Sequence, residues 1–109
     1  MNTHQQPSTW YLYLIENKLG QLYTGITTSP ERRISQHRGD IAGGARALKG
    51  KGPLQFRAIF LIGDRSTASQ IEYKVKQLSK EKKRAIVKQK VLPENLCKNS
   101  QYISPSDYQ

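Results

Sequence analysis

Two short apolar segments separated by a turn constrain the fold of this chain more than any other feature of its sequence. Residues 10–15 read Trp-Tyr-Leu-Tyr-Leu-Ile, and residues 21–26 read Gln-Leu-Tyr-Thr-Gly-Ile. Both are rich in residues that favour strands, and residues 17–20 between them have turn composition. A connection this short predicts an antiparallel hairpin. We therefore expect the hairpin to bring Tyr13 and Tyr23 close together across a sheet.

A helix-start signature follows the hairpin. Residues 28–31 read Thr-Ser-Pro-Glu, which places a capping side chain before a proline and a glutamate three positions after the threonine. These signals predict a helix from about residue 30 to residue 38. Arg33 and His37 are four positions apart in this helix, so both side chains are expected to project from one face.

A glycine-rich stretch separates this helix from a third predicted strand. Residues 38–53 contain five glycines interleaved with basic residues, which are Arg38, Arg46, Lys49 and Lys51. This composition predicts a flexible basic loop with a helical turn around residues 45–48. Residues 55–62 are mostly apolar and predict a more buried strand that stops at the Gly-Asp pair of residues 63–64.

Helical periodicity returns after the third strand. A second helix is expected to start near residues 66–67, and its apolar stripe consists of Ile71, Val75 and Leu78. Glu72 lies beside that stripe. Ser79 is suited to cap a third helix through the charged run of residues 80–87.

These elements together predict an α/β (α+β) fold, with a small three-stranded antiparallel sheet flanked by helices. We expect one domain over residues 10–88, because a chain of 109 residues holds a single modest core. Residues 1–9 are expected to form a flexible polar tail. Residues 89–109 lack periodicity beyond Pro93 and are expected to form a tail of uncertain order.

The chain carries a large excess of positive charge. Eighteen Lys and Arg residues outnumber eight Asp and Glu residues, and the basic residues run from Lys18 to Lys98. A surplus spread in this way indicates a polyanionic partner, of which nucleic acid is the commonest. The alternative is a basic protein whose charge serves only its solubility.

Cysteine content and hydropathy indicate the cellular compartment in which the protein is expected. Cys97 is the one cysteine of the chain, which excludes a disulfide framework and a cysteine-based zinc site within it. Residues 1–8 lack the apolar centre of a signal peptide, and no segment approaches the roughly 18 apolar residues that cross a bilayer. We therefore expect a monomeric cytoplasmic protein that contacts no membrane.

Taken in order, the predicted elements resemble the GIY-YIG nuclease family. Residues 11–13 (Tyr-Leu-Tyr) match the first family motif, and residues 23–25 (Tyr-Thr-Gly) match the second. A helix with Arg-x-x-x-His and a later helix with a single glutamate, Glu72, complete the pattern. The run over residues 22–28 is similar to the small stand-alone bacterial subgroup called YhbQ-like. The resemblance covers about residues 10–87.

The resemblance implies a metal-dependent DNA nuclease with an active site formed by Tyr13, Tyr23, Arg33, His37 and Glu72. Glu72 is expected to hold one Mg²⁺ or Mn²⁺, since a hard cation accepts one carboxylate together with water and phosphate oxygens. Arg33 is expected to grip the scissile phosphate. One tyrosine is expected to activate or position the water while the other orders the network. His37 is expected to relay a proton or to support the phosphate.

The sequence departs from the family pattern in three respects. Tyr11 stands where the family has its first glycine, and Thr24 stands where it has the isoleucine of the second motif. Both positions shape backbone and packing. An equivalent of the asparagine that larger relatives place after the glutamate helix is not identified, since Asn95 and Asn99 lie in the predicted C-terminal tail.

The expected substrate is DNA, with RNA as the alternative. The residues expected to contact its backbone are Arg38, Arg46, Lys49, Lys51, Lys76, Lys80 and Lys83. A domain of this size carries no appended reader, so we expect low sequence specificity and action on structured, nicked or single-stranded DNA in repair or processing. Small-molecule substrates are not expected. The competing hypotheses are a nucleic-acid-binding adaptor with little or no catalysis and an RNA-associated basic protein.

Overall fold

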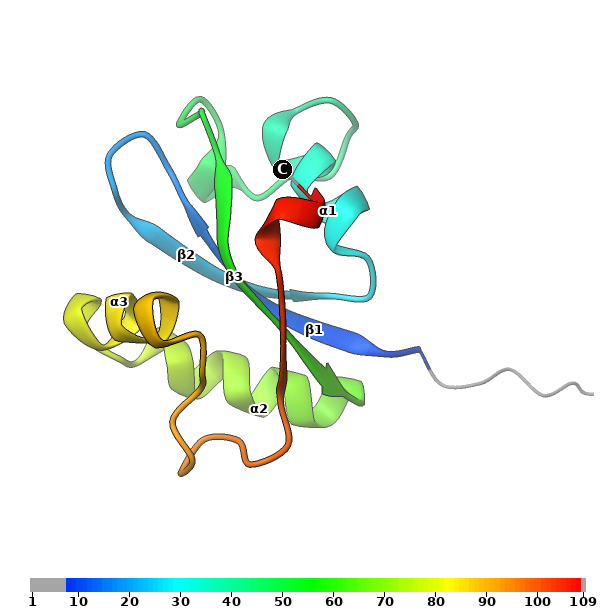
Figure 1. Ribbon diagram of the computed structural model, residues 1–109. Helices are drawn as coiled ribbons and strands as arrows, with labels where there is room; N and C mark the ends of the chain where they lie inside the picture. Colours follow the sequence, from blue (N-terminus) through cyan, green and yellow to red (C-terminus); the bar gives the residue numbers. More distant parts are fainter. Residues whose placement is uncertain (1–7, 109) are drawn as a thin grey trace, which may run out of the picture.

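A four-stranded antiparallel sheet forms the centre of the computed structural model, which describes residues 8–108 (Figure 1). The strands follow the order β2-β1-β3-β4, and they are β1 (Trp10–Glu16), β2 (Leu22–Thr27), β3 (Gln55–Gly63) and β4 (Gln101–Ile103). The helices are α1 (Pro30–Arg38), α2 (Arg65–Lys76) and α3 (Lys80–Gln89), with short 3-10 turns η1 (Arg46–Leu48) and η2 (Pro105–Tyr108). The predicted α/β class is confirmed. Most of the N-terminal tail predicted over residues 1–9 lies outside the described residues.

The predicted hairpin is confirmed. Strands β1 and β2 pair antiparallel, and Tyr13 lies opposite Gly25 in their register. Asn17 stabilises the turn, since its side-chain oxygen accepts hydrogen bonds from the backbone N–H groups of Leu19 at 2.9 Å and Gln21 at 3.0 Å. Gly20 completes the turn with a φ of 76°, a conformation that glycine adopts without steric cost.

The prediction of three strands is wrong, because β4 adds a fourth at the free side of β3. In this pairing Phe60 lies opposite Tyr102, and their rings meet edge to face at 5.6 Å between centroids. Further along, Tyr108 in η2 packs its ring against Phe56 at 6.4 Å. A strand of three residues has too few positions to show an alternating pattern. Its place is determined by contacts with residues distant in the sequence.

Helix boundaries agree with the capping signals, with one local difference. Helix α1 spans the predicted residues, and of the threonine and serine that the sequence offers as caps, Ser29 is the cap and accepts a hydrogen bond from the Arg32 N–H. Helix α2 begins at Arg65, slightly earlier than predicted, because the Asp64 carboxylate caps it. The third helix is capped by the serine that the sequence indicated.

The sheet separates two buried clusters, because side chains alternate between its faces along each strand. The helix core lies between the sheet and helices α2 and α3, and its buried members are Leu12, Leu14, Ala58, Phe60, Ile71, Val75, Ile86 and Leu92. The tyrosine core lies on the opposite face, and its buried members are Tyr13, Ile15, Ile34, Leu48, Leu54, Phe56 and Ile59.

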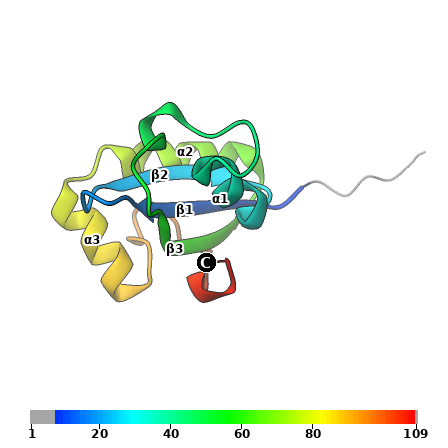
Figure 2. The ribbon, with the colours of Figure 1, turned by 90° about the horizontal axis from the view of Figure 1, so that it is seen from above.

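Strand β2 lies at one edge of the sheet, with α1 on one face of the sheet and α2 on the other. Figure 2 shows β1 between β2 and β3, with α1 lying over the sheet on the viewer's side. Helix α2 packs against β1 and β2 from the other face. Side chains from α1 and α2 can therefore approach each other around the β2 edge. Among the helices of residues 8–108, none combines the length and apolarity required to cross a membrane.

Candidate active site

Tyr13 stands at the centre of a buried hydrogen-bond cluster in the tyrosine core. Its hydroxyl oxygen lies 2.8 Å from Nε2 of His37, and Nε of Arg33 donates to the same oxygen at 3.4 Å. The Tyr13 side chain comes from β1, whereas the other two project from one face of α1, as their spacing predicted. The structure therefore brings three of the five predicted site residues into contact.

The surroundings of His37 determine which of its ring nitrogens carries the proton. The backbone N–H of Ala45 donates to Nδ1 at 3.1 Å, so Nδ1 acts as the acceptor. In a neutral imidazole the proton then resides on Nε2, which donates to the Tyr13 hydroxyl. Burial of the ring, together with the charge of Arg33, lowers the pKa of His37 to about 4. The imidazole is therefore neutral at physiological pH, and both of its nitrogens are occupied.

The Tyr13 hydroxyl is held in its protonated form, and neither of its two hydrogen bonds uses its own hydrogen. Its oxygen accepts from His37 and Arg33, which occupies both lone pairs. Burial raises the pKa of Tyr13 to about 12, outweighing the hydrogen bond and charge of Arg33, which lower it. Tyr13 at neutral pH is therefore suited to donate a hydrogen bond.

Gly25 explains why the second motif ends in glycine. It lies directly opposite Tyr13 in the hairpin, and a Cβ at this position would overlap the Tyr13 hydroxyl and ring. A larger residue would push the ring away from His37 and Arg33. Gly25 is thus a steric requirement of the tyrosine position rather than a turn residue.

Tyr23 lies beside the cluster but does not join its hydrogen bonds. Its ring meets that of His37 edge to face at 5.5 Å between centroids and lies 6.5 Å from that of Tyr13. The residue is half-buried. Within residues 8–108 the Tyr23 hydroxyl has no hydrogen-bond partner. Its oxygen is therefore available to a ligand.

Glu72 approaches this cluster from the opposite face of the sheet. It projects from α2, its side chain is 23% exposed, and Nζ of Lys76, four residues further along the helix, lies 3.4 Å from its Oε2. The negative charge of Glu72 contributes to raising the pKa of Tyr13, so the carboxylate is near enough to act electrostatically on the cluster. Glu72 on α2 and Arg33 on α1 therefore lie on opposite faces of the sheet.

The donor set at this edge limits the kind of metal that fits. In the part of the chain that the structure describes, no three His, Cys, Asp or Glu side chains gather closely enough to form a metal site. A cation requiring several protein ligands is thus not accommodated. A single half-buried carboxylate does fit a hard divalent cation that keeps water and binds substrate phosphate oxygens.

Three positioning contacts were not predicted from the sequence. Arg33 donates through Nη1 to the Gln36 side-chain oxygen at 2.9 Å and to the Gly43 carbonyl at 2.8 Å. Ala45 supplies the N–H that fixes the His37 ring. A Cβ at Gly44 would overlap the Gln36 carbonyl, so the loop passes directly over the end of α1. The glycine pair in this loop was interpreted as a sign of flexibility, whereas it permits this close approach.

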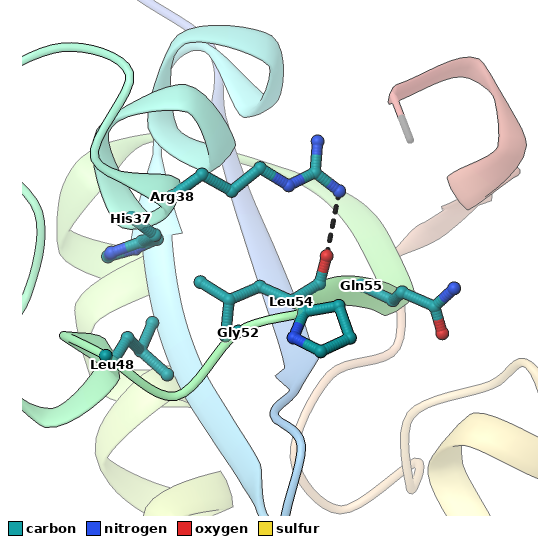
Figure 3. A pocket seen from close by; sticks show the side chains of 8 residues that line it. His37, Arg38, Leu48, Gly52, Leu54 and Gln55 are labelled. Carbon is teal, nitrogen blue, oxygen red and sulfur yellow. Dashed lines mark hydrogen bonds between the residues drawn. The ribbon is translucent and has the colours of Figure 1, made fainter.

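The predicted DNA contacts fall into two groups. On the α1 face, Arg46 and Lys49 are exposed beside a pocket that includes His37. Figure 3 shows Arg38 reaching across to the segment before β3, where its Nη2 donates to the Leu54 carbonyl at 2.8 Å. Lys51 is half-buried. The second group lies on α2 and α3 and comprises exposed Lys76 and Lys80 and half-buried Lys83.

Comparison with known proteins shows the family to which the chain belongs. The family model described as the GIY-YIG catalytic domain matches residues 9–85. A UPF0213 protein of Photorhabdus laumondii is 55% identical, and the match covers 72% of this chain and 73% of that protein. A UPF0213 protein of Pectobacterium carotovorum is 45% identical, and the match covers 89% of this chain and 94% of that protein. The solution structure of a UPF0213 protein of Bacillus halodurans superimposes with a TM-score of 0.50 at 37% identity, covering 81% of this chain and 92% of that one. The chain therefore belongs to the GIY-YIG catalytic domain family, in its small UPF0213 or YhbQ-like group.

Proposed function

We propose that this protein is a metal-dependent DNA nuclease that hydrolyses phosphodiester bonds in structured, nicked or single-stranded DNA. The observation that carries the proposal is the hydrogen-bonded cluster of Tyr13, His37 and Arg33, with Glu72 on α2 at the opposite face of the sheet. Membership of the family supports a nuclease-type activity. The role in DNA repair or processing, the monomeric state and the cytoplasmic location are parts of the same proposal.

Glu72 is the residue that would hold the metal, Mg²⁺ or Mn²⁺. Such a cation, when bound, supplies positive charge that neutralises a phosphate oxygen and makes a water molecule more acidic. The carboxylate is partly exposed, so substrate oxygens can reach the same position. The Lys76 ammonium, which now lies beside it, must move or be replaced as that charge arrives.

Arg33 would bind the scissile phosphate through Nη2. Its Nε and Nη1 donate to Tyr13, Gln36 and the Gly43 carbonyl, and these contacts hold the guanidinium plane in a fixed orientation. Within residues 8–108 no acceptor is bonded to Nη2. A preorganised donor of this kind stabilises the charge that develops on phosphate without having to be ordered during the reaction.

The two tyrosines have separate tasks in this scheme. Tyr13 is neutral, and because both lone pairs of its oxygen are occupied it donates its hydrogen to the water or to a phosphate oxygen. Tyr23 keeps an oxygen without a protein partner, so it is the tyrosine that can accept a proton or a hydrogen bond from the attacking water. His37 is a positioning residue, since it is 4% exposed and acts through Tyr13.

The decisive experiment is a cleavage assay with labelled duplex, flap and single-stranded DNA in the presence of Mg²⁺, Mn²⁺ or EDTA. Glu72→Gln is expected to lower the metal-dependent rate by a factor on the order of 100 to 1000, the size typical for removal of one electrostatic contact to the transition state. Glu81→Gln on α3 is the matched control, because that glutamate is exposed and lies outside the cluster. Undiminished metal-dependent cleavage by Glu72→Gln would exclude the site assignment.

One observation favours a second candidate function, a nucleic-acid-binding adaptor without turnover. The Lys76 ammonium lies 3.4 Å from the Glu72 carboxylate and already neutralises it, which is the arrangement expected of a metal-free surface pair. An adaptor would bind DNA or RNA with strong salt dependence, because phosphate contacts release counterions. Binding of this kind without cleavage of any DNA under either metal would identify the adaptor. Parallel titration with RNA and DNA at fixed salt distinguishes the nucleic acids.

A further inference from the structure

Trp10 is a large aromatic side chain that the fold leaves partly exposed. It is the single tryptophan of the chain and the first residue of β1. Neither the helix core nor the tyrosine core, as formed by the described residues, includes it. The side chain remains half-buried. A large aromatic ring at a strand end, outside both cores, requires another explanation.

The surroundings of Trp10 connect it to the proposed phosphate-binding residue. A pocket at the end of the β2 edge is lined by both Trp10 and Arg33, with Thr28, Arg32 and Gln36 also contributing. Cζ of Arg65, at the start of α2, lies 5.3 Å from the centroid of the Trp10 ring. The pocket thus combines an aromatic side chain with polar and basic side chains, and the cation of Arg65, which is not part of the pocket lining, lies against the same aromatic ring.

We propose that Trp10, together with Arg65, is a stacking site for an unpaired DNA base adjacent to the phosphate bound by Arg33. This inference rests on the proposed function and deepens it by naming the substrate class. Aromatic side chains bind bases of any sequence because every base presents a π face. In an intact duplex those faces are covered by neighbouring base pairs. The site therefore selects DNA that is single-stranded or frayed beside the cleaved bond.

The charges around the pocket suit a strand rather than a free base. Arg32 is exposed at the pocket, so it can contact the phosphate on the far side of the stacked nucleotide. Thr28 and Gln36 offer hydrogen-bonding groups that do not distinguish strongly among bases. This combination agrees with low sequence specificity and with a preference set by strand structure.

Tryptophan fluorescence tests the stacking directly, because Trp10 alone supplies that signal in the whole chain. Wild-type protein in EDTA would be titrated with a short oligothymidylate and with an oligomer of equal length and charge whose sugars lack bases. Stacking is expected to quench the fluorescence with the first oligomer and to leave it nearly unchanged with the second. Equal quenching by both oligomers would overturn the proposal. Since no cleavage is involved, this outcome is independent of the nuclease proposal.

A thermodynamic cycle tests the same contact through affinity. A single abasic site moved along a single-stranded oligomer is expected to weaken binding to the wild type by about 10- to 100-fold at one position. Trp10→Ala is expected to bind intact DNA more weakly than the wild type by the same factor. Introducing the abasic site is expected to weaken its binding no further. Trp10→Phe, which keeps a ring, is expected to recover most of the affinity, and thermal unfolding of both variants checks their folding. Equal abasic penalties in wild type and Trp10→Ala would contradict the stacking contact.

The cleavage assay separates failure of this inference from failure of the proposed function. If the inference holds, Trp10→Ala lowers cleavage of single-stranded and flap DNA and leaves the requirement for Glu72 intact. Cleavage that is equally fast on a blunt duplex and a single strand, and that is unchanged by Trp10→Ala, overturns the stacking site while the nuclease stands. If the fluorescence quenching depends on the bases but the protein cleaves no DNA, the stacking site is supported and the nuclease proposal is rejected.

Discussion

The two faces of the sheet are packed by different kinds of side chains. The buried members of the helix core are apolar throughout, whereas the tyrosine core contains Tyr13 at 1% exposure, bonded to buried His37 at 2.8 Å. A buried polar group costs free energy unless it is hydrogen-bonded, and even a satisfied pair stabilises a fold little more than apolar side chains of equal size. The difference indicates that the α1 face is arranged to hold a hydroxyl group in place, while the apolar core of the other face stabilises the fold and supports α2, which carries Glu72.

The largest expected effect would break the helix core. Phe60→Ala removes a ring that is 1% exposed and packs against Tyr102, so it is expected to lower the free energy of unfolding by about 3–5 kcal/mol. Activity per folded molecule should remain, because Phe60 lies on the face opposite Tyr13. Denaturant unfolding and cleavage rates measured below the melting temperature check both parts. A specific loss of activity at full stability would contradict the division between the faces.

The next effect concerns the pH dependence of stability on the tyrosine side. The pKa of His37 falls from 6.5 to about 4 on folding, so between these values the unfolded chain binds more protons than the folded one. Stability therefore declines as pH falls from about 6.5 to about 4, by roughly 3 kcal/mol in total. Urea unfolding across this range is expected to show the decline in the wild type and its absence in His37→Gln.

We expect protonation of His37, rather than of carboxylates, to cause the loss of stability between about pH 6.5 and pH 4. Asp64 is held below its ordinary pKa of 3.8 by hydrogen bonds from Thr67, so its contribution is lost at lower pH. The opposite limit comes from Tyr13, whose pKa is raised from 10.0 to about 12, so that stability is lost as pH rises through that interval. An equal acidic slope in wild type and His37→Gln would show that another group is responsible.

These two faces also differ in how well the sequence predicts them. The hairpin and the caps of α1 and α3 are determined by neighbours in the sequence, and local patterns predicted them. Strand β4 was missed because Tyr102 and Tyr108 find their partners on β3 rather than nearby. The stripe of Ile71 and Val75 predicted the apolar face of α2, since its periodicity is regular.

Much of the tyrosine side depends on contacts that leave no periodic signal. Resemblance to a family brought Tyr13, Arg33 and His37 together as candidates, and the structure supplies the bonds between them. The N–H of Ala45 determines the protonated nitrogen of His37, yet a backbone group has no signature in a sequence. The same holds for the Gly43 carbonyl that orients Arg33. Positioning by a loop could therefore be found only from coordinates.

A smaller effect sharpens the distinction between packing and function on the tyrosine side. Tyr13→Phe keeps the ring but removes the acceptor for His37, and an unsatisfied buried donor costs about 1–3 kcal/mol. Cleavage should fall by a factor of about 100 or more, because the oriented hydroxyl is lost. Tyr11→Phe is the matched control on the same strand, since within residues 8–108 its hydroxyl bonds to nothing. Equal activity of the two variants would show that the Tyr13 hydroxyl serves packing alone.

The smallest expected effect tests whether DNA contacts both faces. Arg33 and Glu72 lie on opposite faces of the sheet. A DNA strand that contacts both residues must therefore pass around the β2 edge and continue over both groups of basic residues. Lys49→Ala on the α1 face and Lys80→Ala on α3 are each expected to weaken binding modestly and to reduce the slope of log affinity against log salt by about 1. Exposed Lys98 lies in neither group, so Lys98→Ala has the same charge change and should leave the slope unaltered. Titrations at several salt concentrations measure these slopes. If only Lys49→Ala alters the slope, the DNA is bound only on the face that holds Tyr13. Glu72, on the opposite face, would then have to act without direct contact with the DNA backbone bound there.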